Sequence, residues 1–202
     1  MLQSGKFEVI LEGLSDQGFS VVSDFLDSSS VARLNAEFDE LYRKGAFARA
    51  KIGKGSLASA NDEIRRDEIL WFDDRSLGPA QKEFWGELIR LKEALNERLF
   101  LGLWDLEGHF ALYPPGGFYQ RHLDRFSNDD ARTVSIVFYL NDHWRPGDGG
   151  ELTIYQDGES ARIVEPRAAT LVCFLSDRIE HEVQPAHRER RSFAGWFRRR
   201  KA

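Results

Sequence analysis

A short motif in the second half of the chain places a histidine and a carboxylate two residues apart. In His122-Leu123-Asp124 an extended backbone would project the imidazole and the carboxylate from one face, where both can bind the same metal ion. A second histidine, His181, follows near the start of a later segment with β character. Two imidazoles and one carboxylate form a facial triad that suits Fe(II) and leaves further coordination positions open. We therefore predict that His122, Asp124 and His181 are the metal ligands and the catalytic residues.

The open positions decide which chemistry such a site supports. A molecule of 2-oxoglutarate would chelate the iron through its C1 carboxylate and 2-oxo group and leave one position for dioxygen, whereas a closed four-ligand zinc site leaves none. A halogenase needs the carboxylate ligand replaced so that a halide can bind, so the presence of Asp124 favours hydroxylation. An H-x-D triplet is common by chance, and the prediction therefore depends on the residues around it.

A candidate clamp for the far carboxylate of 2-oxoglutarate lies after the second histidine. The guanidinium of Arg190 can bind a carboxylate through two parallel hydrogen bonds. Strand alternation gives this segment two faces, and one of them carries Arg190, Ser192, Ala194 and Trp196. The same alternation in residues 133–140 groups Tyr139 with Val137, so that Tyr139 can offer its hydroxyl to the carboxylate that Arg190 binds.

Length and composition favour one intracellular domain. With 202 residues, 42% of them hydrophobic, the chain can bury a core of its own, and we expect a single domain over residues 1–202. Its one cysteine, Cys173, lies in an apolar run and cannot build a disulfide framework. No apolar stretch approaches the roughly 20 residues of a membrane span, and the N-terminus lacks the pattern of a signal peptide. We therefore expect a cytoplasmic protein without a membrane partner.

The first half of the chain is predicted to form helices around short strands. Apolar residues recur at helical spacing between Val31 and Leu41, with serines at 28–30 as caps and Gly45 as a stop, and again after Pro79. Between these helices, residues 46–61 show little periodicity and predict a loop over a site. We assign residues 1–107 to helical support and a substrate loop.

The second half reads as short strands separated by turns. We expect a core of β structure over residues 108–197, and the strands are predicted at residues 109–113, 133–140, 151–155, 161–164, 170–175 and 192–197. Strands this short and numerous are typical of a jelly roll. The predicted fold is thus mainly β with supporting α: a cupin-like double-stranded β-helix, or jelly roll, backed by N-terminal helices.

Several motifs together resemble the prolyl 4-hydroxylases, and among them the hypoxia-inducible-factor prolyl hydroxylases and their prokaryotic relatives. The resemblance covers nearly the whole chain, and its motifs are residues 21–26, 65–71, 113–124, 139–141, 149–152, 176–178 and 181–186. It implies a double-stranded β-helix, iron at the three residues named above, and 2-oxoglutarate contacts from Tyr113, Tyr139 and Arg190. It also implies pocket walls at Val137, Leu152, Val183 and Trp196, and substrate contacts at Arg132 and at the loop preceding Asp67.

The resemblance implies hydroxylation of a prolyl residue in a protein substrate, with Fe(II), 2-oxoglutarate and dioxygen as cofactor and cosubstrates and ascorbate as a further candidate. For a bacterial member, a translation factor such as elongation factor Tu is the substrate that it suggests.

Two other functions stay open at the level of the sequence. A 2-oxoglutarate-dependent nucleic-acid demethylase shares the H-x-D motif and a distal histidine, and the arginine-rich residues 187–201 could hold phosphates. The net charge of −5 argues against nucleic acid, and we interpret residues 198–201 as a solvated tail. A non-catalytic cupin-like binding protein is the second alternative. A carboxylate clamp of Arg190 and Tyr139 argues against it, because a barrel that only binds metal has no need of one.

We give His109, His143 and His187 structural rather than ligand roles.

Overall fold

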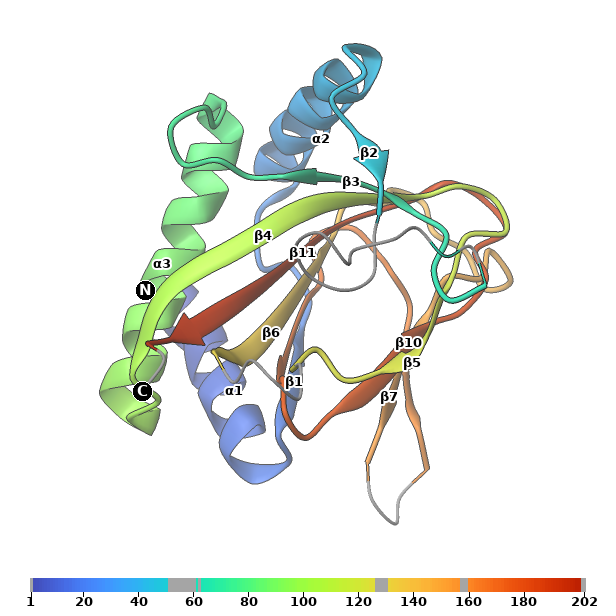
Figure 1. The fold of residues 1–202 in the computed structure, drawn as a ribbon. Helices are drawn as coiled ribbons and strands as arrows, with labels where there is room; N and C mark the ends of the chain where they lie inside the picture. The colour runs from blue at the N-terminus through green and yellow to red at the C-terminus, as the bar shows by residue number, and fades with distance from the viewer. Residues whose placement is uncertain (1, 51–60, 62, 126–130, 157–159, 201–202) are drawn as a thin grey trace.

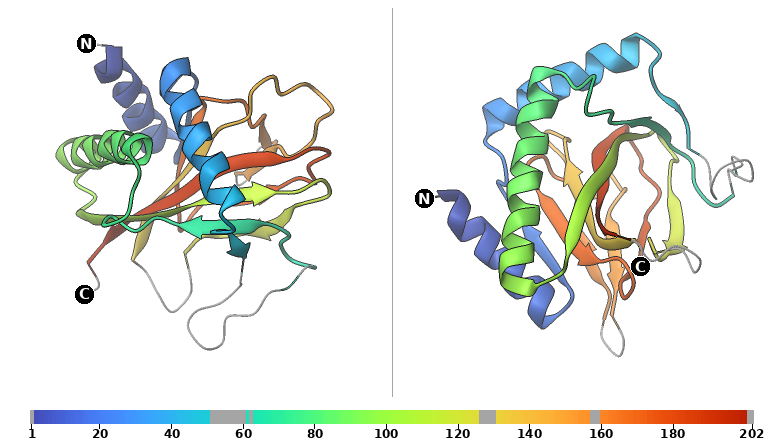
Figure 2. Two further views of the ribbon diagram at one scale, coloured as in Figure 1. Left: turned by 90° about the horizontal axis from the view of Figure 1, so that it is seen from above. Right: turned by 60° about the vertical axis from the view of Figure 1, so that its left-hand side comes forward.

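Three helices lie on one side of a large β-sheet. The computed structural model describes residues 2–50, 61, 63–125, 131–156 and 160–200. The helices are α1 (Leu2–Asp16), α2 (Ser28–Arg43) and α3 (Pro79–Leu99), and they cover the outer face of the sheet (Figures 1 and 2). Asp27 caps α2 by accepting a hydrogen bond from the Ser30 amide at 2.8 Å. A side chain of α2, Glu37, accepts hydrogen bonds from the first amides of α3 and thereby ties the two helices together.

The strands form two sheets in which every neighbouring pair of strands is antiparallel. The seven-stranded sheet has the order β1-β9-β6-β11-β4-β3-β2, and the four-stranded sheet has the order β5-β10-β7-β8. The bounds are β1 (Phe19–Val22), β2 (Ala48–Arg49), β3 (Glu68–Trp71), β4 (Leu103–Tyr113), β5 (Tyr119–His122), β6 (Arg132–Tyr139), β7 (Leu152–Tyr155), β8 (Arg162–Val164), β9 (Leu171–Leu175), β10 (Glu180–Val183) and β11 (Arg190–Arg199). The sheets face each other as a double-stranded β-helix, which confirms the predicted fold class.

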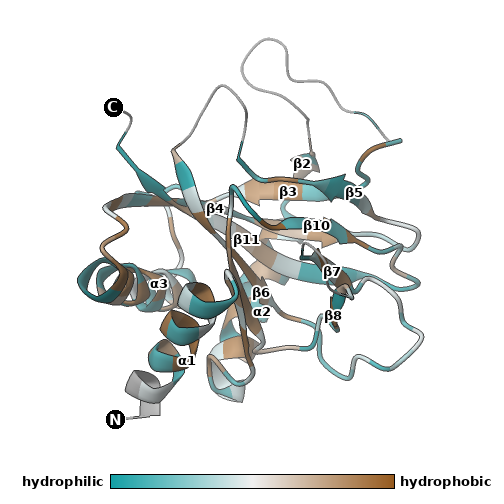
Figure 3. Cartoon of the chain, turned by 90° about the horizontal axis from the view of Figure 1, so that it is seen from below, coloured by the Kyte–Doolittle hydropathy of each residue, from teal (hydrophilic) through white to brown (hydrophobic). Residues whose placement is uncertain are grey.

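The core has two parts, one on each face of the large sheet. One cluster lies between helices and sheet, and its fully buried members include Phe38, Leu88 and Phe193. The other lies between the two sheets and includes Val172, Phe174 and Ile154. Hydrophobic and hydrophilic stretches alternate along each helix (Figure 3), as expected of helices that bury one face.

Most predicted elements are present, with shifted ends. The helices predicted around residues 31–41 and after Pro79 are α2 and α3, and Gly45 follows α2 with a φ of 69°. The six predicted strands correspond to β4, β6, β7, β8, β9 and β11. However, β4 and β11 are longer than predicted because they pair with each other over nearly their whole length, and β11 also pairs with β6 over most of it. Helix α1 was not predicted. Short strands were expected in the first half without bounds, and β5 and β10 were expected only as extended segments at His122 and His181.

Part of the predicted loop over residues 46–61 contains β2, and its residues 51–60 lie outside the described residues. Among the described residues no helix is both long and apolar enough to cross a membrane.

Candidate active site

The three predicted metal ligands come together between the two sheets. His122 ends β5, Asp124 follows just beyond that strand, and His181 lies on β10, where it is the cross-strand partner of His122. The Nε2 atoms of His122 and His181 lie 3.5 Å and 3.7 Å from the two carboxylate oxygens of Asp124. One ligand atom of each residue lies within 4.8 Å of the others. The carboxylate reaches the histidines from a bend after β5 and not from the strand that the sequence predicted.

The donor chemistry of this cluster fits a divalent metal. The Nδ1 atoms of His122 and His181 lie 2.7 Å and 3.2 Å from the backbone oxygens of Gln120 and Ile179. Because a carbonyl only accepts, each Nδ1 carries the proton and each Nε2 presents a lone pair toward Asp124. Burial lowers the pKa of His181 to about 4, so this ring is neutral near pH 7. Burial alone would raise the pKa of Asp124, but the positive charge that the facing imidazoles carry when protonated holds it well below its usual range.

A buried arginine lies at the closed end of the same space. Arg190 opens β11 and is 1% exposed. Its Nε donates to the backbone oxygen of Gly150 at 2.8 Å, and its Nη1 donates to Ser192 Oγ at 3.1 Å. Among the described residues no carboxylate lies within ion-pair distance of this guanidinium. A cation so deeply buried without a counter-ion is costly, and a bound carboxylate would neutralise it.

Two tyrosines face this arginine from neighbouring strands. The rings of Tyr113 on β4 and Tyr139 on β6 lie 4.8 Å and 5.1 Å from the Arg190 guanidinium carbon. Burial raises the pKa of both, to about 12 for Tyr139, so both hydroxyls keep their protons. The Tyr139 hydroxyl has no hydrogen-bond partner among the described residues. An anion at Arg190 would therefore also find a phenolic donor without a partner.

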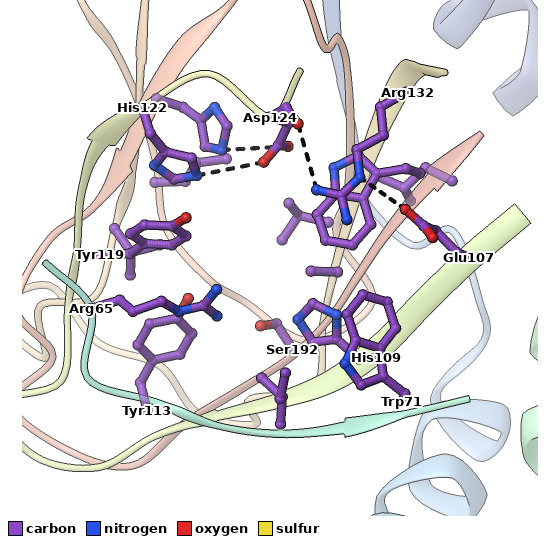
Figure 4. Close-up of a pocket in the computed structure, with 18 of the residues that line it drawn as sticks. Arg65, Trp71, Glu107, His109, Tyr113, Tyr119, His122, Asp124, Arg132 and Ser192 are labelled. Atoms are coloured by element: carbon purple, nitrogen blue, oxygen red, sulfur yellow. Dashed lines mark hydrogen bonds and ion pairs between the residues drawn. The ribbon is translucent and has the colours of Figure 1, made fainter. Parts of the chain in front are cut away.

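A cavity of about 570 Å³ is lined both by this arginine and by the two histidines. Figure 4 shows part of its lining, with His122 and Asp124 across the cavity from His109 and Trp71. Most predicted site residues line it, namely Tyr113, His122, Asp124, Arg132, Val137, Leu152, His181, Val183, Arg190, Ser192 and Trp196. Tyr139 is buried behind the lining, and Asp67 is not among the lining residues. The alternation predicted for β11 is confirmed, since Arg190, Ser192, Ala194 and Trp196 all face the cavity.

The two predicted substrate contacts lie in different surroundings. Arg132 begins β6 near the open end, where its Nε donates to Glu107 at 2.9 Å and its guanidinium lies 3.5 Å from the Trp196 ring. The carboxylate of Asp67 is fully buried and accepts two hydrogen bonds from Arg65, at 2.7 Å and 2.5 Å. In this structure Asp67 contacts Arg65, and Arg65 is the member of the pair that faces the cavity.

Several lining residues were missed by the sequence analysis, for two different reasons. Arg65, Trp71, Glu107, His109 and Tyr119 all reach the cavity. Side chains alternate between the two faces of a strand, so counting back from Tyr113 along β4 would have placed His109 and Glu107 on the cavity face. By contrast, Arg65 reaches it because its segment pairs with Tyr119, a long-range contact with no local signal.

The remaining polar candidates lie elsewhere. His143 and His187 are exposed, and neither lines the cavity. His109 lines it but does not belong to the ligand cluster. Three arginines of the basic C-terminal segment are ion-paired, because arginines 188, 191 and 198 contact Asp148, Asp39 and Asp105 respectively. These pairs leave less positive charge for phosphates than the sequence suggested.

Comparison with known proteins supports the same chemistry. A family model described as the 2OG-Fe(II) oxygenase superfamily matches residues 108–198. The hypoxia-inducible factor prolyl hydroxylase of Caenorhabditis elegans is 30% identical and the Homo sapiens Egl nine homolog 1 is 32% identical, each over 94% of this chain. The chain spans only 28% and 46% of the length of these two relatives.

Solved structures match over their whole length or nearly so. A Pseudomonas putida prolyl-4-hydroxylase is 42% identical, with a TM-score of 0.88, and the match covers 96% of this chain and 100% of that one. A Trichoplax adhaerens prolyl hydroxylase, solved in complex with a peptide fragment of the hypoxia inducible factor oxygen degradation domain, is 27% identical with a TM-score of 0.88. That match covers 98% of this chain and 90% of the other.

Proposed function

Because the chain belongs to the prolyl hydroxylase family of 2OG-Fe(II) oxygenases, we propose that it hydroxylates a prolyl residue of a protein substrate. Members of this superfamily use Fe(II), 2-oxoglutarate and dioxygen. When bound, the iron supplies oxygen activation, in which 2-oxoglutarate is oxidised to succinate and carbon dioxide while one oxygen atom enters a C–H bond of the substrate. His122, Asp124 and His181 would hold the metal.

The observation that carries this proposal is the buried, uncompensated charge of Arg190. It lies in the same cavity as the three ligands and has no carboxylate partner among the described residues. A protein that only binds a metal would gain nothing from this arrangement. A dicarboxylate that chelates the iron at one end and reaches Arg190 with the other would explain why the three ligands and an uncompensated arginine share one cavity.

The protein's own residues then perform the positioning. Arg190 and Ser192 bind the distal carboxylate, and the protonated hydroxyls of Tyr113 and Tyr139 donate to it. The walls contributed by Val137, Leu152 and Val183 are apolar, and they exclude water from the space beside the ligands. This arrangement fixes the cosubstrate in one orientation and leaves the open end of the cavity for the substrate.

The substrate would enter at that open end. Trp71 is half exposed there, and Trp196 lies behind it at a ring distance of 6.1 Å. Two flat aromatic rings suit a prolyl ring, which packs its CH groups against aromatic faces. Arg132 lies beside them, its guanidinium held by Glu107, and can donate to a peptide carbonyl. A translation factor such as elongation factor Tu is the first target to examine, on the strength of the sequence resemblance alone.

The test separates cosubstrate turnover from substrate identity. The purified chain is incubated with Fe(II), 2-oxoglutarate and oxygen, with and without cell lysate, and succinate is measured. We expect succinate formation that Asp124→Ala abolishes, because this change removes a metal ligand. Full turnover by Asp124→Ala would refute the ligand assignment. Loss of methyl groups from nucleic acid, with no oxygen gained by any protein, would refute prolyl hydroxylation.

A further inference from the structure

The two imidazoles of the ligand cluster are supported differently. The His181 ring packs on Phe174 at 4.5 Å, and Phe174 is fully buried in the core between the sheets. The His122 ring stacks on Tyr119 at 3.7 Å, with only 18° between the planes. Tyr119 begins the edge strand β5 and is only partly buried. The core therefore fixes Phe174, on which His181 packs. Tyr119, on which His122 stacks, is not fixed by the core and needs another contact to hold it in place.

Arg65 holds Tyr119 from the other side. Its guanidinium carbon lies 4.4 Å from the centre of the Tyr119 ring. In Figure 4 the guanidinium lies between the rings of Tyr119 and Tyr113, and His122 lies beyond Tyr119. These residues form a column that runs from Tyr113 through Arg65 and Tyr119 to His122. Stacking of a guanidinium on an aromatic face is attractive and more so where water is excluded.

The guanidinium itself is fixed by a buried ion pair and by backbone pairing. Asp67, whose side chain is fully buried, accepts from both Nε and Nη2 of Arg65, which prevents the guanidinium from rotating. The backbone on either side of Arg65 is tied to β5, because Arg66 N donates to Phe118 O and Gln120 N donates to Ile64 O, both at 2.9 Å. Arg65 can therefore transmit the position of its segment to Tyr119.

We propose that Arg65 is a positioning residue that, through Tyr119, fixes the orientation of the His122 imidazole for metal binding. This inference rests on the proposed function, because it takes His122 to be a metal ligand. It also gives Asp67 a role other than substrate contact, which is to hold Arg65. Supports of this kind around ligating histidines commonly change metal affinity by 10- to 100-fold when removed.

The chain offers a matched control in the next residue. Arg66 belongs to the same segment, but its guanidinium lies 5.7 Å from the Phe118 ring and it does not line the cavity. Arg66→Gln therefore removes a neighbouring charge without touching the column. Arg65 is replaced together with its partner, as Arg65→Gln with Asp67→Asn, so that no unpaired carboxylate stays buried. Tyr119→Phe keeps the stacking ring, and Tyr119→Leu removes it.

The measurement is titration of metal-free protein with Co(II), followed by calorimetry and by the visible spectrum of the bound ion. We expect about 10-fold weaker binding and a changed spectrum for the Arg65–Asp67 double variant and for Tyr119→Leu. Arg66→Gln and Tyr119→Phe should match the wild type. Combining Tyr119→Leu with the double variant should cause no further loss, because Arg65 acts through the tyrosine.

Three outcomes would count against the inference. Unchanged Co(II) affinity and spectrum in the folded Arg65–Asp67 variant would overturn it while leaving the proposed function intact. Additive losses in the combined variant would also overturn it, because Arg65 would then act independently of Tyr119. Failure of the wild-type chain to bind Co(II) would instead overturn the proposed function and this inference with it. Thermal unfolding of each metal-free variant confirms that the compared proteins are folded.

Discussion

Replacing His109 with leucine should make the metal-free protein less sensitive to acid. His109 is 3% exposed, packs against Trp71 and Trp196, and has no hydrogen-bond partner for its Nδ1 among the described residues. Burial, with the nearby charges of Arg65 and Arg132, lowers the pKa of His109 to about 3, although Asp124 acts in the opposite direction. The folded protein therefore keeps this imidazole neutral at mildly acidic pH.

The sign and size of the effect follow from proton linkage. In the unfolded chain the pKa of a histidine is about 6.5, so the unfolded state binds a proton first as the pH falls. The stability contributed by the depressed pKa is present above about pH 6.5 and is lost as the pH falls toward about 3. Between pH 7 and pH 5 this single group should cost about 2 kcal/mol of unfolding free energy.

Urea unfolding of chelator-treated protein at pH 7 and pH 5 measures this cost. The wild type should lose about 2 kcal/mol more than His109→Leu between the two pH values. The contribution of His181 is present in both proteins and cancels. His143→Asn is the control, because His143 is exposed and its φ of 53° suits asparagine. Equal pH dependence in the wild type and His109→Leu would refute the reasoning.

Three further predictions concern other parts of the chain. Arg190→Met should remove the charge that binds the distal carboxylate and weaken 2-oxoglutarate binding by about 2 kcal/mol or more. The affinity is measured by calorimetry with Co(II)-loaded protein, and an affinity equal to that of the wild type would exclude Arg190 as the clamp. Arg65→Ala alone should destabilise the fold by about 3 kcal/mol in urea unfolding, because it leaves the buried Asp67 unpaired, and adding Asp67→Asn should restore most of that loss. Gly108→Ala should lower the melting temperature, because a Cβ there would lie 2.2 Å from the Phe193 ring, and an unchanged melting temperature would contradict this.

Local patterns predicted much of this fold. The helix ends at Pro79 and Gly45 and the strands of the second half follow from periodicity and turn residues, which act over a few positions. Helix α1 was missed although Ile10, Leu11 and Leu14 lie at helical spacing and are buried, and the exposed apolar Val9 makes this pattern less one-sided than in α2. Strands β2 and β3 are short and are defined by pairing that is distant in sequence, since β2 pairs with β3 and β3 pairs with β4.

In the candidate site, too, local patterns predicted some residues, and contacts between distant parts of the sequence determined others. The cluster of His122, Asp124 and His181 was readable from residue types, and the face of β11 that carries Arg190 was readable from alternation. Sequence reasoning missed Arg65 and assigned Asp67 to the substrate, because the pairing of residue 65 with Tyr119 is created only by folding. Alternation along β4 could have placed His109 on the cavity face, but spacing could not reveal that its Nδ1 would have no hydrogen-bond partner among the described residues.

The most direct test of prolyl hydroxylation follows the oxygen atom. The purified chain, with Fe(II) and 2-oxoglutarate, is incubated with cell lysate under ¹⁸O₂, and peptides are mapped by mass spectrometry against a parallel Asp124→Ala reaction. We predict that a protein gains one ¹⁸O atom on a prolyl residue only with the wild-type chain. Labelling confined to other residue types, or labelling that persists with Asp124→Ala, would contradict the proposal.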